Sequence, residues 1–167
     1  MPILETHQLL WPDEAACAAF ANHLADRLAN RLSTAPGLID TSIELHGALG
    51  AGKTSFVRHL LRALGVTGRI KSPSYAVLES YQLPRGDEVH HFDFYRFADP
   101  REWEDAGFRD LFAAPGLKLS EWAEKAAGML PVADLQIALH VGDDDSRAVT
   151  LTAGTARGVA ILESLDA

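Results

Sequence analysis

One short segment of the chain has the residue types and the spacing of a phosphate-binding loop. Residues 47–54 read GALGAGKT and fit the pattern G-x-x-x-x-G-K-[ST]. In such a loop the backbone N–H groups face the phosphates, the lysine reaches the β- and γ-phosphates, and the threonine hydroxyl ligates Mg²⁺. The residues expected to bind the nucleotide are Gly47, Gly50, Ala51, Gly52, Lys53, Thr54 and Ser55. The plainer alternative is a glycine-rich turn before an ordinary helix.

Two acidic residues stand where a metal and a water molecule could be handled. Asp93 comes near the end of the apolar segment 89–94, and Glu121 directly follows the segment 117–120. If both segments are strands of a parallel sheet, their carboxyl ends converge on one ligand crevice. We therefore expect Thr54, Asp93 and Glu121 to surround one Mg²⁺ and one attacking water, the two acids being catalytic. Alternatively, Asp93 caps a turn and Glu121 is an N-terminal carboxylate of the helix that follows it.

Two further features lie near these residues in the sequence. The loop 71–74 (KSPS) offers the hydroxyls of Ser72 and Ser74, and many phosphate-loop proteins keep a switch-like segment for the γ-phosphate at this place. Taken alone, it is only a polar loop. Trp122 follows Glu121 and is expected either to stack near the nucleotide or to pack in the core.

The elements that must position these residues alternate between strands and helices. Strands are expected from apolar and β-branched segments, helices from apolar residues spaced by three or four, and turns from glycine and proline. The expected strands are 3–10, 41–46, 75–83, 88–94, 117–120, 132–141 and 147–152, with antiparallel hairpins at 75–94 and 132–152. The expected helices are 12–33, 55–64 closed by Gly65, one starting at Asp99-Pro100-Arg101-Glu102, 121–127 and 155–165.

Length and composition indicate one globular domain covering residues 1–167. With 47% apolar and 23% charged residues, the chain resembles ordinary folded proteins. It contains no apolar run long enough for a membrane helix and no secretory signal pattern, so we expect a cytoplasmic protein without membrane contact. Its single cysteine, Cys17, excludes an internal disulfide, and His90 and His91 are expected to be structural. The net charge of −8 argues against autonomous binding to nucleic acid.

Four segments in a fixed order resemble the TsaE (YjeE) family of bacterial P-loop ATPases. They are GALGAGKT at 47–54, SPSY at 72–75, HFDFYR at 91–96 and SEW at 120–122. The resemblance covers about residues 12–152 and leaves 153–167 outside. Ala48 replaces the acidic residue usual in the family's loop, and Ser74 replaces a threonine while keeping a hydroxyl.

The resemblance implies an α/β fold of the P-loop NTPase type, a three-layer sandwich whose mostly parallel central sheet is flanked by antiparallel strands. It also implies Mg²⁺-dependent ATP hydrolysis in the threonylcarbamoyladenosine (t6A) modification of tRNA, coupled to a TsaB–TsaD-like partner complex. Transfer RNA would then be reached only indirectly. An adenine nucleotide is expected because the chain lacks the guanine-reading Asn-Lys-x-Asp motif. The alternatives are a small-molecule P-loop kinase, with Arg101 and Arg109 on a lid, and a nucleotide-gated binding module without useful hydrolysis.

Overall fold

One mixed β-sheet runs through the protein. The computed structural model describes residues 3–31 and 39–166, whose seven strands lie in the order β1-β7-β6-β2-β5-β4-β3. The strands are β1 (Glu5–Trp11), β2 (Asp40–His46), β3 (Leu78–Gln82), β4 (Glu88–Asp93), β5 (Gly116–Glu121), β6 (Leu135–Val141) and β7 (Arg147–Ala153). The central strands β6, β2, β5 and β4 are parallel, while β1, β7 and β3 run antiparallel to their neighbours. The expected α/β sheet is confirmed.

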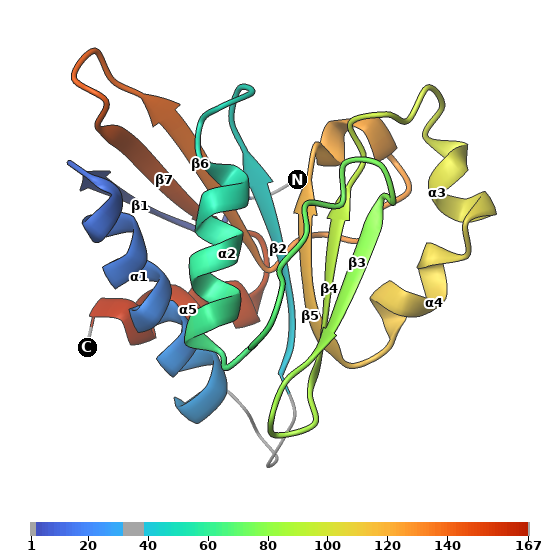
Figure 1. The fold of residues 1–167 in the computed structure, drawn as a ribbon, viewed down its shortest axis with the longest axis horizontal. Helices are drawn as coiled ribbons and strands as arrows, with labels where there is room; N and C mark the ends of the chain where they lie inside the picture. Colours follow the sequence, from blue (N-terminus) through green and yellow to red (C-terminus); the bar gives the residue numbers. More distant parts are fainter. Residues whose placement is uncertain (1–2, 32–38, 167) are drawn as a thin grey trace.

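Helices lie on both faces of this sheet (Figure 1). They are α1 (Glu14–Asp26), the π-helical turn η1 (Arg27–Arg31), α2 (Lys53–Ala63), α3 (Arg101–Asp105), α4 (Phe108–Ala113), the 3₁₀ helix η2 (Ala123–Ala126) and α5 (Ala156–Asp166). None of the helices within residues 3–31 and 39–166 is both long and apolar enough to cross a membrane.

Alternation along the strands assigns side chains to the two faces. In β2, Ile43 and Leu45 are fully buried, and they pack with α1, α2 and α5 on what we call the first face. Glu44 and His46 point to the opposite, second face. There Phe92 of β4 packs with residues of α3 and α4 in a separate aromatic cluster. The sheet therefore carries its main core on the first face and a smaller one on the second.

Several local predictions are confirmed. The helix after the phosphate-binding loop ends at Ala63, and Gly65 follows with φ of 103°, a conformation that favours glycine. Both expected hairpins form, β3 with β4 and β6 with β7. The helix α3 begins at Arg101 with Pro100 in the N-cap position, one residue later than expected. The expected hydrogen bonds still form: Asp99 Oδ1 accepts the Arg101 N–H at 2.9 Å, and Glu102 Oε2 accepts the Asp99 N–H at 3.1 Å.

Four predicted elements differ from the observed ones, and one of them, the strand expected from residue 132, simply begins later, at Leu135. No α-helix spans 121–127: Glu121 still belongs to β5, Trp122 is left-handed with φ of 59°, and only η2 follows. The strand expected from residue 75 begins at Leu78, because Val77 has φ of 68° and its N–H closes a turn onto the Pro73 carbonyl. The first helix changes to π-helical geometry after Asp26, and residues 32–33, expected to end it, lie outside the described residues.

Candidate functional site

The phosphate-binding loop connects the end of β2 to the N-terminus of α2, the helix that packs on the first face. Gly47 directly follows β2 and has φ of 149°; a Cβ atom at this position would lie 2.8 Å from the Leu139 carbonyl oxygen. Gly52 precedes α2 in a left-handed conformation with φ of 106° and offers no side-chain cap. The first turn of α2 therefore presents backbone N–H groups and the positive end of the helix dipole, which together favour an anion.

Lys53, the first residue of α2, lies inside this loop. Its ammonium group donates a hydrogen bond to the Gly47 carbonyl and lies 3.9 Å from the centroid of the Trp122 ring. Burial lowers the pKa of Lys53, and the negative charge of Glu121 opposes that shift. The lysine charge is therefore held in a poorly solvated position, where an added phosphate would be attracted strongly. Trp122 contacts the predicted nucleotide site and is not confined to the core.

Glu121, at the carboxyl end of β5, contacts residues of both β4 and α2. Its carboxylate accepts a hydrogen bond from the Thr54 hydroxyl, with oxygen–oxygen distances of 3.2 and 3.3 Å. It also accepts the Nε2–H of His91, on β4, at 2.6 Å. Both side chains of this second pair are buried, with 1% and 3% of their surface exposed. Glu121 is thus not a cap of the helical turn that follows it.

Sequence reasoning placed His91 only as a structural residue and missed its contact with Glu121. The signal was present in the alternation of β4. His91 lies two residues before Asp93, so both side chains point to the first face. Its partner could not be read from β4 alone, because the pairing of β4 with β5 is a long-range contact.

Asp93 is the last residue of β4 and pairs in register with Glu121. It is buried, and its Oδ1 accepts the Tyr95 N–H at 2.9 Å. Burial raises the pKa of Asp93, and the hydrogen bond from Tyr95 partly opposes that rise. Asp93 therefore caps a turn, which was the alternative predicted from the sequence. It also presents a carboxyl group to the same crevice as Glu121.

These residues surround one cavity of about 340 Å³ at the carboxyl ends of β2, β4 and β5. Its lining includes every residue predicted for the site except Gly47 and Ala51. The lining residues are Leu49, Gly50, Gly52, Lys53, Thr54, Ser55, Ser72, Ser74, Asp93, Glu121 and Trp122. The fold thus brings together side chains that are more than sixty residues apart in sequence. Their roles in binding and catalysis stay predictions.

The loop predicted to act as a switch forms one wall of this cavity. The hydroxyls of Ser72 and Ser74 lie 3.2 Å apart, and the buried Pro73 anchors the loop between them. Arg96 holds the loop from outside: its Nε–H donates to the Ser74 carbonyl at 3.0 Å, and its guanidinium lies 4.3 Å from the centroid of the Tyr75 ring. Arg96 therefore contacts the loop backbone rather than the cavity.

One arginine that is distant in sequence contacts the phosphate-binding loop, and the two weighed for a kinase lid do not reach the cavity. Arg147, at the start of β7, donates from Nε to the Ala51 carbonyl at 2.8 Å and thereby braces the phosphate-binding loop. Nothing local in the sequence marks it, because the contact depends on the packing of the β6–β7 hairpin. Arg101 and Arg109, weighed for a kinase lid, pair with Asp99 and Glu104 on the surface and do not line the cavity.

The oxygen groups in the cavity suit Mg²⁺, which needs few protein ligands, better than they suit a metal that is coordinated by protein side chains alone. Among residues 3–31 and 39–166, no group of three or more His, Cys, Asp or Glu side chains forms a metal site. Mg²⁺ ordinarily takes one or two carboxylates and obtains its other ligands from phosphates and water. Thr54 fits such a site, because donating its hydroxyl proton to Glu121 leaves the oxygen lone pairs for a cation. Asp93 provides a second carboxyl group.

Comparison with known proteins relates this chain to one family. The model of the family "Threonylcarbamoyl adenosine biosynthesis protein TsaE" matches residues 11–149. The tRNA threonylcarbamoyladenosine biosynthesis protein TsaE of Haemophilus influenzae is 39% identical over 155 residues, which cover 93% of this chain and 94% of that protein. The Bacillus subtilis protein of the same name is 36% identical, covering 74% and 77%. The crystal structure of Bacillus subtilis YdiB superposes with a TM-score of 0.78 at 26% identity, covering 99% and 97% of the two chains.

Proposed function

The chain belongs to the TsaE family, and from this premise we propose that it binds and hydrolyses ATP within the threonylcarbamoyladenosine modification of tRNA. The relatives named above are tRNA threonylcarbamoyladenosine biosynthesis proteins. Turnover would depend on Mg²⁺ and would be coupled to a TsaB–TsaD-like partner complex. The setting is cytoplasmic, where the partner and not this acidic chain would hold the tRNA.

One observation carries the proposal: Lys53, Thr54, Asp93 and Glu121 line a single cavity at the N-terminus of α2. Backbone N–H groups and the ammonium of Lys53 would bind the phosphates. A bound Mg²⁺ would neutralise charge that develops on the phosphates and fix their orientation. This combination of helix N-terminus, buried cation and carboxylates is what phosphoryl transfer to water requires.

Glu121 and Asp93 would have different roles in the reaction. Glu121 accepts from both Thr54 and His91, so its orientation is fixed, and it would keep the Thr54 oxygen turned toward the metal side of the cavity. Asp93 makes a hydrogen bond through one carboxylate oxygen to Tyr95, and its carboxyl group would orient the attacking water or hold the metal through water. Neither role requires a covalent intermediate.

Coupling to a partner would run through the loop 71–75. Ser72 and Ser74 reach the cavity, while the Ser74 carbonyl and the exposed ring of Tyr75 are held by Arg96 at the surface. A γ-phosphate bound by the serines would order this loop, and its loss on hydrolysis would release it. The surface around Tyr75 would then differ between the ATP and ADP states.

The first experiment tests nucleotide choice. Titration calorimetry with Mg²⁺ should give tighter binding of ATP and ADP than of GTP. Equal affinity for GTP would remove the adenine preference, and no binding of any nucleotide would remove the proposed function.

The second experiment tests turnover. ATP hydrolysis should be slow for the chain alone and rise when TsaB–TsaD-like partners are added, by about 10³–10⁵-fold if the partner supplies an arginine. Phosphoryl transfer to a metabolite without partner would instead favour the kinase. Binding without hydrolysis, even with partner, would favour the nucleotide-gated module.

A further inference from the structure

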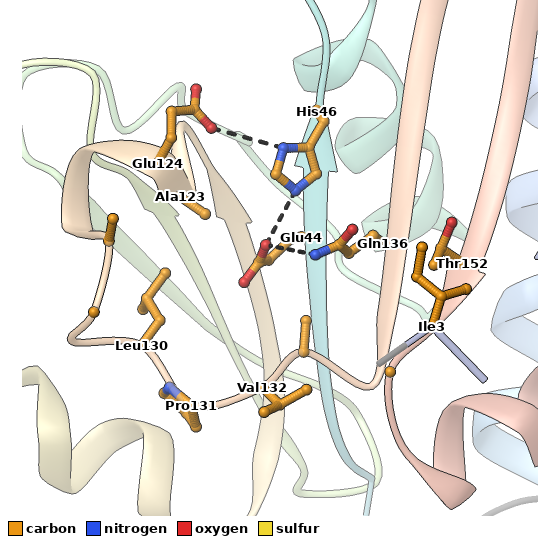
Figure 2. A pocket seen from close by; sticks show the side chains of 14 residues that line it. Ile3, Glu44, His46, Ala123, Glu124, Leu130, Pro131, Val132, Gln136 and Thr152 are labelled. Carbon is orange, nitrogen blue, oxygen red and sulfur yellow. Dashed lines mark hydrogen bonds and ion pairs between the residues drawn. The ribbon is translucent and has the colours of Figure 1, made fainter. Parts of the chain in front are cut away.

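A second cavity lies on the opposite face of the sheet from the phosphate-binding loop's helix. It has a volume of about 360 Å³ and is open to solvent between β2, β6 and the connection from η2 to β6 (Figure 2). Glu44, His46 and Gln136 project into it from neighbouring strands, and Glu124 faces them from η2. We call it the acidic cavity.

The polar side of the acidic cavity carries more negative than positive charge. The Glu44 carboxylate accepts from His46 Nε2 at 3.0 Å and from the Gln136 amide at 3.4 Å. The other imidazole nitrogen of His46 lies 3.6 Å from Glu124 Oε2. Two carboxylates thus share one imidazole, and even a charged imidazole leaves the group with a net negative charge. Only 13% of the Glu44 side chain is exposed, so its field is poorly screened by water.

The opposite side of the acidic cavity is apolar, and two of its residues also line a neighbouring cavity. Leu130 and Pro131 line both the acidic cavity and a neighbouring space of about 270 Å³. Trp103, Phe112 and Met129 line that space, which we call the apolar cavity. Its one lining arginine, Arg109, is already paired with Glu104, so it adds little net charge.

These two cavities match one kind of occupant. A Lys or Arg side chain carries a cationic head on an apolar stem, so its head would reach Glu44 and Glu124 while its stem lies along Leu130 and Pro131. An apolar residue beside it would fill the apolar cavity. We propose that this paired groove docks a protein segment that presents a basic side chain next to an apolar one.

The position of the groove gives such docking a route to the nucleotide site. His46 is the residue immediately before Gly47, the first residue of the phosphate-binding loop. Glu124 lies three residues after Glu121, and Trp122 between them contacts Lys53. Two parts of the acidic cavity's wall are therefore continuous along the chain with the phosphate-binding loop and with Glu121. The inference rests on the proposed function only in expecting that this chain works with a partner protein.

The test uses the whole ¹⁵N-labelled chain and a defined probe, the capped tripeptide acetyl-Leu-Arg-Leu-amide, followed by NMR. We expect resonance changes confined to residues that line the two cavities, among them His46, Glu124, Gln136, Trp103 and Met129, with saturation in the millimolar range. The same peptide with citrulline in place of arginine has the same shape without the charge, and should bind at least about tenfold more weakly. A probe with glutamate in place of arginine should not bind.

Variants of the chain complete the test. Glu44→Gln together with Glu124→Gln should weaken arginine-peptide binding about tenfold, while Glu163→Gln, an exposed position on α5, should leave it unchanged. Lys53→Ala should still bind the peptide, which separates this surface from the nucleotide site. Equal binding of the citrulline peptide, changes at other surfaces, or no binding at about 10 mM would overturn the proposal.

Discussion

His91 on β4 and Glu121 on β5 form a buried hydrogen bond, 2.6 Å from Nε2 to Oε2, beneath the cavity that holds Lys53 and Thr54. The same carboxylate accepts the Thr54 hydroxyl. His91 therefore acts as a positioning residue, because it fixes the orientation of Glu121 without itself lining the cavity.

Removing the imidazole should destabilise the protein. In His91→Ala the buried Glu121 carboxylate loses a donor, and we expect the free energy of unfolding to fall by about 3 kcal/mol. His90→Ala is the control. His90 is also buried but lies on the other face, where it bonds the neutral Ser80 hydroxyl and lies 3.5 Å from the exposed Glu88 carboxylate; its loss should be about 1 kcal/mol. Urea denaturation measures both, and equal losses would contradict a special role for the pair.

Lys53→Ala should weaken ATP binding. The variant removes a charged donor from the phosphate-binding loop, which costs about 1.5–3 kcal/mol, or more than about tenfold in the dissociation constant. Arg58→Ala removes the same charge from an exposed position on α2 and should change the affinity little. Calorimetry with Mg²⁺ and ATP decides, and wild-type affinity in Lys53→Ala would reject the assigned role.

Asp93→Asn should lose turnover without losing stability. Hydrolysis with partner present should fall at least about tenfold, which corresponds to roughly 1.4 kcal/mol of barrier. The amide oxygen of asparagine can still accept the Tyr95 N–H. Because burial raises the pKa of Asp93, the ionised carboxylate is disfavoured in the folded chain at neutral pH, and the neutral amide removes that cost. A less stable variant at neutral pH would contradict this account.

The same raised pKa predicts a pH dependence. The stability of the wild-type chain relative to Asp93→Asn should be highest below the pKa of an unfolded aspartate and should fall as pH rises through the raised pKa of Asp93. Turnover should follow the opposite course, because the proposed role of Asp93 in holding water or metal needs its ionised form, and the rate should decline on acidification at a pH above the usual aspartate range. Denaturation and rate profiles against pH measure the two trends.

Substitutions at two loop glycines should differ in cost. Gly47→Ala adds a Cβ atom 2.8 Å from the Leu139 carbonyl at a φ of 149°, so we expect a loss of more than about 2 kcal/mol. Gly50→Ala has φ of 78° but meets no atom within 4 Å, and its cost should be about 1 kcal/mol. Thermal unfolding ranks the two, and the reverse order would show that the close approach to Leu139 is relaxed in solution.

Cys17 should resist alkylation in the folded protein. Burial raises the pKa of its thiol to about 11, from 9.0, so the reactive thiolate at pH 8 is about a hundredfold scarcer than for an unperturbed thiol. Iodoacetamide labelling followed by mass spectrometry should be slow in buffer and fast in denaturant. Rapid labelling of the native chain would mean that α1 opens readily.

The sequence by itself determined the local parts of this protein. The glycines and Lys53–Thr54 specify the phosphate-binding loop, the apolar alternation specifies the strands, and the Asp99–Glu102 pair specifies a helix start. These features depend on residues within a few positions of one another, so period and turn chemistry are sufficient to read them. The convergence of Thr54, Asp93 and Glu121 followed from one further rule, that parallel strands bring their carboxyl ends to the same edge.

Only the tertiary structure determined which side chains contact one another across the sheet. His91 bonds Glu121 because β4 and β5 pair in one register, and Arg147 reaches Ala51 because the β6–β7 hairpin packs beside β2. The acidic cavity likewise forms from side chains of β2, β6 and η2. Such contacts join residues tens of positions apart. They depend on the register of the strands, which is set by the packing of the whole sheet and cannot be read from a local sequence pattern.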